Sequence, residues 1–319
     1  MCYSAQIQAD YRRYVKMFGA QMDIREFARL FWERAEGGKA KIPKAMEDAF
    51  LEPQTDDERQ IKKFIDRFNT EQATTLEQDL FKQRARLADA ERALQTKVTK
   101  AATESRRIAT DKIDAALRRL ADLGRTEQEP RDSRIFPGYY APVLVVEDGQ
   151  YVVKPMRYQC RMAGKPANYD TRFPGTYNAR RDRLEEYWRP LFGYSHGLMI
   201  VSRFYENVSR ARMEGRTLAQ GEKDENVVLE FTPDSGGDML VACLWSRWTA
   251  KDEPDLLSFA AITDEPPPEV VVAGHDRCIV PIKPENVEAW LNPDPSNLDA
   301  LHAILDDRDR PYYEHRLAA

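Results

Sequence analysis

The chain carries a cysteine directly after Met1, where one residue can offer two nucleophiles. Once Met1 is removed, Cys2 presents an α-amine and a thiol on the same carbon framework. Reference pKa values of about 7.7–8.0 for an α-amine and about 8.5 for a thiol leave part of each group unprotonated at neutral pH. The amine can form a Schiff base with an aldehyde, and the thiol can then close a five-membered thiazolidine ring. Cys2 therefore predicts covalent capture of an aldehyde.

Three later segments supply the other groups that such a condensation needs. They are Tyr-Asn-Ala-Arg around Asn178, Arg-Phe-Tyr-Glu ending at Glu206, and Gly-His-Asp-Arg around His275. Imine formation requires a base that removes a proton from the amine and an acid that donates one to the departing hydroxyl. A carboxylate and an imidazole with separated pKa values can divide these two tasks.

In this order, Met1-Cys2 and the three segments resemble the SRAP family, the SOS-response-associated peptidases that crosslink to abasic sites in single-stranded DNA. The resemblance covers the first dozen residues and most of residues 134–291. It implies that Cys2 is the covalent nucleophile and that Asn178 holds this residue and the reacting sugar. It also implies that Glu206 orients the amine and shuttles its proton, and that His275 opens the sugar ring and helps to reverse the adduct. Met1 would leave by self-cleavage or through an aminopeptidase.

The resemblance also implies a groove for single-stranded DNA. Arg180 and Arg277 match arginines that hold phosphates, whereas Thr263 and Pro137 match residues that line the groove. Arg161 is a candidate only because it lies in a cationic stretch, residues 156–216, with twelve Lys/Arg against six Asp/Glu. Eleven of the twelve are arginine, which forks onto phosphate, and such a patch can steer DNA although the net charge is -5.

The sequence departs from the family pattern at positions that grip DNA. Ser4 replaces an arginine that would contact phosphate, and Tyr3 replaces a glycine. Residues 158–164 replace a segment with Trp-Gly followed by Pro and Trp, and Asn207 replaces the tryptophan after the glutamate. We therefore expect the chemistry to be retained and the DNA contacts to be remodelled.

Two other functions fit the same residues. Cys2 could serve a cysteine-dependent peptidase or amidase, because the logic of an N-terminal nucleophile is shared with other amine-activated enzymes. Alternatively, the site is degenerate and the chain is a scaffold that assembles through its helical arm. Four roles are open for that arm: self-association, binding of a protein partner, extension of the DNA-binding surface, or a hairpin that packs only on itself.

Composition excludes several classes of protein. No apolar run approaches the roughly 20 residues of a membrane span, and the start of the chain has no basic or apolar signal-peptide region. The four cysteines are widely spaced without a CxxC pair, which argues against a zinc site, and no cofactor is expected. We expect a cytoplasmic or nucleoid-associated protein without a membrane partner, whose partner is single-stranded DNA with abasic sites.

The pattern along the chain predicts three parts. Residues 1–40 should hold the nucleophile and two short helices, the second capped by Asp23 with Glu26. Residues 41–130 should form a helical insertion, because residues 54–123 contain no Gly or Pro and repeat leucines among dense charges. Residues 131–319 should form an SRAP-like catalytic and DNA-binding core.

The third part has the pattern of short strands. Asp148-Gly149 predicts a hairpin between residues 143–146 and 151–154, and residues 226–231 and 239–244 flank a turn in the same way. Residues 259–263, 270–273 and 278–282 should be further strands, followed by helices at 284–291 and 298–305. The expected fold is α+β, with a mostly antiparallel, barrel-like SRAP core, flanking helices and a long charged helical insertion.

Overall fold

The computed structural model describes residues 3–318. They divide into two compact units. The first, here called the sheet unit, contains the chain up to Leu30, Lys39–Glu52 and the chain from Pro130 onward. The second, the helical unit, contains Phe31–Gly38 and Pro53–Glu129.

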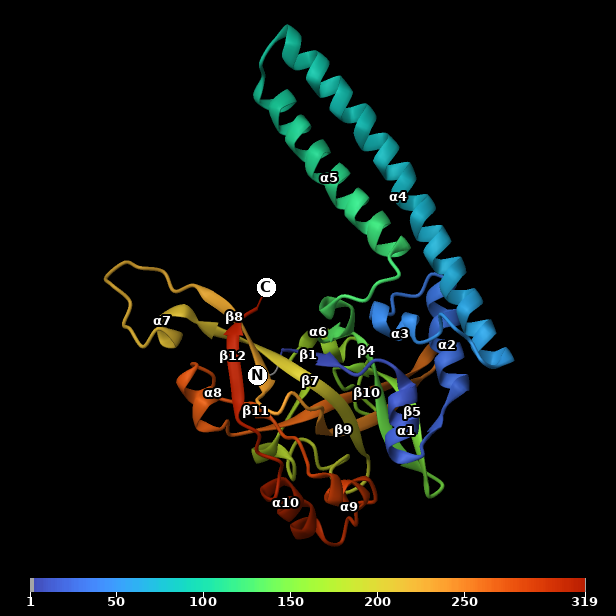
Figure 1. The fold of residues 1–319 in the computed structure, drawn as a ribbon, viewed down its shortest axis with the longest axis vertical. Coiled ribbons are helices and arrows are strands. Elements are labelled where there is room, and N and C mark those ends of the chain that lie inside the picture. Colours follow the sequence, from blue (N-terminus) through green and yellow to red (C-terminus); the bar gives the residue numbers. More distant parts are fainter. Residues whose placement is uncertain (1–2, 319) are drawn as a thin grey trace. The chain divides into compact units, whose positions relative to one another are not determined.

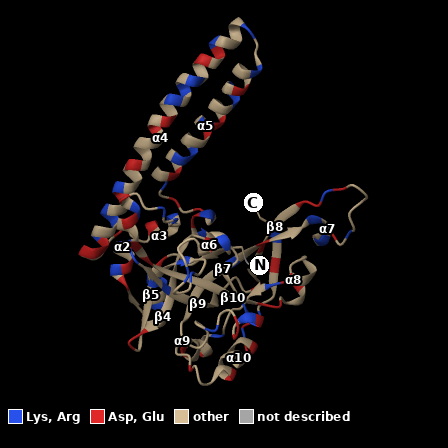
Figure 2. Ribbon diagram, turned by 180° about the vertical axis from the view of Figure 1, so that it is seen from behind, with Lys and Arg blue, Asp and Glu red and all other residues tan. Residues whose placement is uncertain are grey.

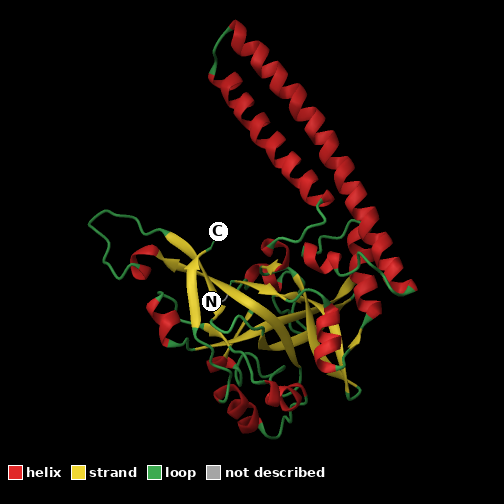
Figure 3. Cartoon of the chain, in the orientation of Figure 1, coloured by secondary structure: helices red, strands yellow, loops and turns green. Residues whose placement is uncertain are grey.

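Five strands close into a barrel at the centre of the sheet unit (Figures 1 and 3). They are β4 (Tyr140–Glu147), β5 (Gln150–Tyr158), β7 (His196–Ser209), β9 (Met239–Ala250) and β10 (Glu253–Asp264). Antiparallel pairing runs from β5 through β4, β7 and β9 to β10, and a parallel pairing of β10 with β5 closes the ring. The expected α+β fold with a mostly antiparallel, barrel-like core is confirmed.

The first hairpin of the barrel forms where the sequence predicts it. Asp148 and Gly149 both have positive φ, 50° and 74°, so they form the type of two-residue turn that matches the twist of paired strands. Glu147 pairs with Gln150 directly beside this turn. The barrel strands carry apolar, fully buried side chains on both faces, among them Val143, Val153, Leu198, Val241 and Phe259.

Shorter strands extend the barrel at its edges. β1 (Ser4–Ile7) lies between β7 and β3 (Arg134–Ile135), antiparallel to both. β6 (Asn178–Arg180) and β11 (Cys278–Ile279) both pair with the end of β10. β2 (Gln21–Met22) pairs with β5. β12 (Tyr313–Leu317) pairs with β8 (Asn226–Pro233), as Figure 1 shows.

The predicted hairpin between residues 226–231 and 239–244 is wrong, although both segments are strands. β8 pairs with residues 204–209 of β7, and β9 pairs with residues 196–201 of the same strand. Both pairings are antiparallel, so β8 and β9 run in one direction along the same edge of β7. The loop between them interrupts this edge and does not reverse the chain, because the 14-residue β7 is long enough to hold both partners.

The strand predicted at residues 270–273 is also wrong. This segment belongs to the short helix α8 (Pro268–Val272). Pro268 stands at the start of the helix, where a proline fits because its missing N–H would have no intrahelical partner. Of the three valines in this segment, Val270 is buried whereas Val271 and Val272 are 54% and 75% exposed. One turn of helix is enough to place Val270 in the core.

Further helices flank the sheet unit. In α1 (Tyr11–Phe18) the Asp10 side chain accepts from Arg12 N, and Asp23 accepts from Glu26 N at the start of α2 (Ile24–Ala35), as predicted for its cap. The predicted C-terminal helices are present as α9 (Val287–Leu291), preceded by the 3-10 turn Pro284–Asn286, and α10 (Leu298–Asp306). The remaining short helices are α3 (Lys44–Asp48), α6 (Tyr169–Arg172) and α7 (Arg210–Met213), with 3-10 turns at Pro130–Ser133 and Arg181–Arg183.

The helical unit is a hairpin of two long helices. α4 (Asp56–Thr96) and α5 (Lys100–Gly124) are separated by a three-residue break, after which the Thr99 hydroxyl accepts from Ala102 N. The interface between them buries small or neutral side chains, among them Leu80, Ala90, Ala109 and Ala116. The prediction of a long helix or a helical hairpin therefore resolves to a hairpin.

Charged residues of both signs are spread along these two helices (Figure 2). Several form ion pairs one turn apart, such as Arg107 with Glu104 and Asp111. Such exposed pairs each stabilise a helix by only about 0.3–0.5 kcal/mol. Within residues 3–318, no helix combines the length and the apolar composition that crossing a lipid bilayer requires.

Candidate functional site

Cys2, the predicted nucleophile, lies outside the described residues. Tyr3, which follows it in the chain, is described, and its backbone N–H donates a hydrogen bond to the Glu206 carboxyl group. The next residue, Ser4, pairs with Tyr205 as β1 joins β7. The strand register thus fixes the first described residues beside the predicted catalytic glutamate.

Glu206 and His275 form the centre of the candidate site. His275 Nε2 lies 3.1 Å from Glu206 Oε2, and both side chains are buried. Burial raises the pKa of Glu206 to about 8 and also lowers the pKa of His275. Because burial disfavours both charged forms, the carboxyl group keeps its proton at neutral pH and the imidazole stays neutral.

The hydrogen bonds of His275 agree with this assignment. Nδ1 lies 2.8 Å from the carbonyl oxygen of Arg277, a contact that requires a proton on Nδ1. Arg277 N also approaches Nδ1, but at 3.3 Å, so we give the shorter contact more weight. With Nδ1 protonated, the neutral ring presents a lone pair at Nε2, to which a protonated Glu206 can donate. The pair therefore holds one transferable proton.

A glycine positions the histidine. His275 follows Gly274, which ends the α8 turn with a φ of 98°, a conformation that strongly favours glycine. A Cβ atom at Gly274 would also lie 3.2 Å from the Cβ atom of Arg212. The Gly-His-Asp-Arg segment thus turns sharply between α8 and β11, which directs the imidazole toward β7.

Asn178 lies at the start of β6, paired with Ala261 of β10. Its side chain is only 4% exposed, and within residues 3–318 neither its amide oxygen nor its amide nitrogen has a hydrogen-bond partner. The hydroxyl groups of Thr176 and Thr263 are also buried and also have no hydrogen-bond partner among the described residues. Buried polar atoms are nearly always hydrogen-bonded, so each of these groups is suited to receive a polar ligand.

The two predicted phosphate-binding arginines lie near each other. Arg180 pairs with Thr263 across β6 and β10, and its guanidinium forms an exposed ion pair with Asp182 at 2.6 Å. Asp276 acts electrostatically on Arg180, and Arg277 acts on Asp182. The ends of β6 and β10 and the loop before β11 therefore bring Arg180, Thr263 and Arg277 to one side of the site.

The Tyr3 ring connects two other predicted positions. It lies 5.7 Å from the ring of Phe136 and 6.3 Å from that of Tyr177, edge-on in both cases. Phe136 precedes the half-buried Pro137, and Tyr177 precedes Asn178. Tyr3 is 44% exposed, so this aromatic cluster borders the site at the surface.

Arg161 lies in a different environment. Its guanidinium forms an ion pair with Asp170 at 2.5 Å and lies 4.4 Å from the centre of the Trp248 ring. The side chain is 11% exposed, and Asp170 also binds Arg157. Arg161 would have to leave this network to contact a phosphate.

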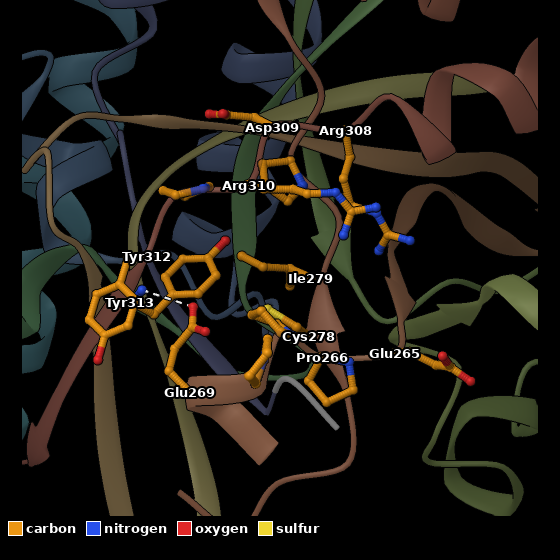
Figure 4. Close-up of a pocket in the computed structure, with 14 residues that line it drawn as sticks. Glu265, Pro266, Glu269, Cys278, Ile279, Arg308, Asp309, Arg310, Tyr312 and Tyr313 are labelled. Carbon is orange, nitrogen blue, oxygen red and sulfur yellow. Dashed lines mark hydrogen bonds between the residues drawn. The ribbon is translucent and has the colours of Figure 1, made fainter. Parts of the chain in front are cut away.

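Two cavities adjoin this region of the sheet unit. One, of about 470 Å³, opens beside His275 and is lined by α8 residues and Arg212. Another, of about 360 Å³, lies between the Pro266–Pro268 turn, Cys278 and residues 308–313 (Figure 4). In this second cavity the Glu269 carboxylate accepts from Tyr313 N, and Asn178, Glu206 and His275 are not among its described lining residues.

The described thiols are poor nucleophiles. Cys160, Cys243 and Cys278 are all buried, and burial raises the pKa of each thiol, that of Cys160 to about 12. Within residues 3–318, no group of three or more His, Cys, Asp or Glu side chains is arranged to hold a metal ion.

Two contacts of the site were not expected from the sequence. The Tyr3 N–H bond to Glu206 depends on the pairing of β1 with β7, which residue types alone do not reveal. Arg134 donates to the Ser4 hydroxyl at 3.0 and 3.1 Å, so a guanidinium from β3 lies beside the position at which an arginine was expected. The signal that could have located Arg134 is the pairing of β1 with β3.

Comparison with known proteins identifies the family. The family model described as SOS response associated peptidase (SRAP) matches residues 95–317. No curated protein matches the chain. Similar solved structures include a protein from Bordetella bronchiseptica, 16% identical over 59% of this chain and 87% of that chain, with a TM-score of 0.46. A protein from Bacteroides thetaiotaomicron is 15% identical over 59% and 78%, with a TM-score of 0.46. A phage-related protein from Bordetella bronchiseptica is 18% identical over 61% and 84%, with a TM-score of 0.44. The match to the family model covers more than half of the chain, which therefore belongs to the SRAP family.

Proposed function

We propose that this protein captures abasic sites in single-stranded DNA as a thiazolidine crosslink to Cys2, after removal of Met1. The observation that carries the proposal is the hydrogen bond from Tyr3 N–H to Glu206, whose carboxyl group contacts His275 at 3.1 Å. This contact holds the backbone of Tyr3, the residue to which Cys2 is bonded, at a buried acid–base pair. An aldehyde-capturing amine needs such a pair within its reach.

The proposed reaction uses the single proton that the pair holds. The α-amine of Cys2 attacks C1 of the ring-opened sugar, and the resulting carbinolamine loses water to form an imine. Glu206, with its pKa raised to about 8, donates a proton to the departing hydroxyl, and His275 accepts the proton that the amine releases. The thiol then adds to the imine carbon and transfers its proton to nitrogen. One water molecule leaves overall, and no oxidant or metal is required.

Asn178 is proposed to hold the sugar and the N-terminal residue. Its buried amide offers two donors and one acceptor without a partner among the described residues, so hydrogen bonds to the substrate would satisfy it. Arg180 and Arg277 are proposed to bind phosphates on the adjacent side, with Thr263 and Pro137 lining the path of the strand. Phosphate contacts would give an affinity that is independent of sequence and falls with salt.

A denaturing gel tests this function. The purified protein is incubated with a labelled single-stranded oligonucleotide that contains one abasic site. We expect a slowly migrating covalent band for the wild type, and no such band for Cys2→Ala. Cys2→Ser keeps the amine but lacks the thiol, so its adduct should survive denaturation only after reduction of the imine with borohydride.

His302 provides a matched control for the catalytic histidine. It also contacts a glutamate, Glu185 at 2.9 Å, but this pair is exposed. His275→Ala should slow formation of the adduct, whereas His302→Ala should crosslink at the wild-type rate. A wild-type protein with Met1 removed that forms no adduct would refute the proposal. Turnover of a peptide that DNA does not inhibit would instead support the peptidase function.

A further inference from the structure

Arg134, on β3, is held by two aromatic rings and a hydroxyl group. Its guanidinium carbon lies 3.7 Å from the centre of the Tyr205 ring and 5.0 Å from that of Phe136. Nε and one terminal nitrogen donate to the Ser4 hydroxyl at 3.1 and 3.0 Å. Two rings and a hydroxyl thus fix the guanidinium plane, so little side-chain entropy remains to be lost when it binds a ligand.

The nearest carboxylate to act on this cation is already shared with other arginines. Among residues 3–318 Arg134 forms no ion pair; burial lowers the pKa of its guanidinium, and Glu230 acts on it only through longer-range electrostatic attraction. The nearby arginines differ, because Arg203 and Arg316 both bind Glu230 at 2.8 Å. A partly buried charge without a directly paired counter-charge is costly, which makes an anion a favourable partner for Arg134.

The strand register places these groups on one face. Gln6 of β1 pairs with Arg134 of β3 on one side and with Arg203 of β7 on the other. Two residues further along β7, Tyr205 pairs with Glu230, which in turn pairs with Arg316 of β12. Residues directly opposite in a sheet project to the same side, so three guanidinium groups share a face with two carboxylates, Glu230 and the Glu314 that lies opposite Thr232. This face carries an excess of one positive charge.

The face is connected to the candidate site through Phe136. The Phe136 ring contacts Tyr3 at 5.7 Å and the Arg134 guanidinium at 5.0 Å. Glu206 follows Tyr205 on β7 and projects to the other side of the sheet. Phe136 therefore links Tyr3, whose backbone N–H contacts Glu206, to the face that carries Arg134.

We propose that Arg134, supported by Arg203 and Arg316, binds the phosphodiester backbone of single-stranded DNA beside the reacting nucleotide. The inference rests on the proposed function, because it assigns the cation that holds the same DNA strand. Arginine matches phosphate with two parallel N–H donors. The excess positive charge favours a polyanion, and the exposed Tyr3 ring and the half-buried Phe136 ring beside it can stack on bases.

Binding of intact single-stranded DNA, without an abasic site, tests this inference separately from the crosslinking chemistry. Fluorescence anisotropy would be measured for the wild type, Arg134→Gln and Arg134→Lys between about 50 and 200 mM salt, the range over which phosphate contacts are strongly screened. Glutamine removes the charge but keeps a donor for Ser4. We expect about tenfold weaker binding, since a hydrogen bond to a charged group contributes about 1.5 kcal/mol or more. The slope of log K against log salt should shrink by about 0.7, the value for one phosphate on a single strand.

Arg247→Ala is the matched control. Arg247 is 46% exposed, and its guanidinium lies 3.7 Å from the Glu26 carboxylate. It pairs with Leu257 of β10, which is six residues, or roughly 20 Å, along the strand from Thr263. It should bind DNA like the wild type, and Arg134→Lys should keep the wild-type salt slope with an intermediate affinity. Wild-type affinity and slope in Arg134→Gln, or an equal loss in Arg247→Ala, would overturn the inference. Absence of crosslinking by a wild type that still binds DNA through Arg134 would refute only the proposed function.

Discussion

Replacing Glu206 with glutamine should change how the stability of the protein depends on pH. Glutamine has the shape of a protonated glutamate, so its amide can accept from Tyr3 N–H and donate to His275 Nε2. Burial raises the pKa of Glu206 from its ordinary value of 4.5 to about 8. Below about pH 4.5 the carboxyl group is protonated in both the folded and the unfolded chain, so it adds no pH dependence.

Between these two pKa values the unfolded chain releases the proton and the folded chain keeps it. The free energy of unfolding of the wild type, relative to Glu206→Gln, should therefore fall as the pH rises from about 4.5 and level off above about 8. At about 1.36 kcal/mol per pKa unit, the total difference is on the order of 4 to 5 kcal/mol. Urea unfolding of both proteins at pH 5, 7 and 9 measures it. Parallel pH profiles of the two proteins would show that Glu206 is not a buried proton carrier.

Three further perturbations have defined outcomes. Asn178→Leu should unfold at an equal or higher denaturant concentration, because an apolar side chain of similar size removes two buried amide atoms that have no partner among the described residues. The same variant should crosslink much more slowly. A large loss of stability would show that the Asn178 amide is needed for folding and not for substrate binding. Gln159→Ala should lower the free energy of unfolding, measured in urea, by roughly 1–3 kcal/mol. It keeps the positive φ of 113° and loses the side-chain hydrogen bonds to the carbonyl oxygens of Asp170 and Pro174. Gln159→Gly should be less destabilised, because glycine tolerates this φ. Ala109→Leu should destabilise the α4–α5 hairpin by about 1–3 kcal/mol, because the larger side chain overpacks the interface. The helical circular dichroism signal should then be lost at a lower temperature than in the wild type. An unchanged melting temperature would contradict close packing at this position.

Local sequence signals identified the elements whose structure depends on neighbouring residues. Asp148-Gly149 predicts its hairpin because both residues tolerate positive φ, and Asp23 predicts a helix start because its carboxylate can accept from a free N–H. The break between α4 and α5 contains no Gly or Pro that would predict it from the sequence. The structure locates it through Thr99, whose side chain caps the start of α5.

Long-range pairing could not be read from the sequence in the same way. Residues 226–231 and 239–244 have the alternation of strands, but their common partner is β7, which is distant in the chain. Val270 to Val272 have a high β propensity, yet the proline at the start of α8 and exposure of two of the valines favour a helical turn. Tertiary context outweighs propensity in both cases.

The candidate site shows the same division. The resemblance singled out Glu206 and His275 separately, and the structure places their side chains 3.1 Å apart. It did not indicate that burial would leave both groups uncharged, because the environment of a side chain depends on the packed fold. Nor did it indicate Arg134, whose role follows from the register of β1 between β3 and β7.

The mass of the amino-terminal peptide after reaction with abasic DNA shows directly whether Cys2 forms the crosslink. The wild-type protein would be incubated with the abasic oligonucleotide, digested with nuclease and protease, and analysed by tandem mass spectrometry. We expect a peptide that begins at Cys2, without Met1, and carries the remaining sugar fragment with the loss of one water molecule. Retention of Met1 on the reacted protein, or a sugar fragment attached to any other residue, would rule out a thiazolidine at Cys2.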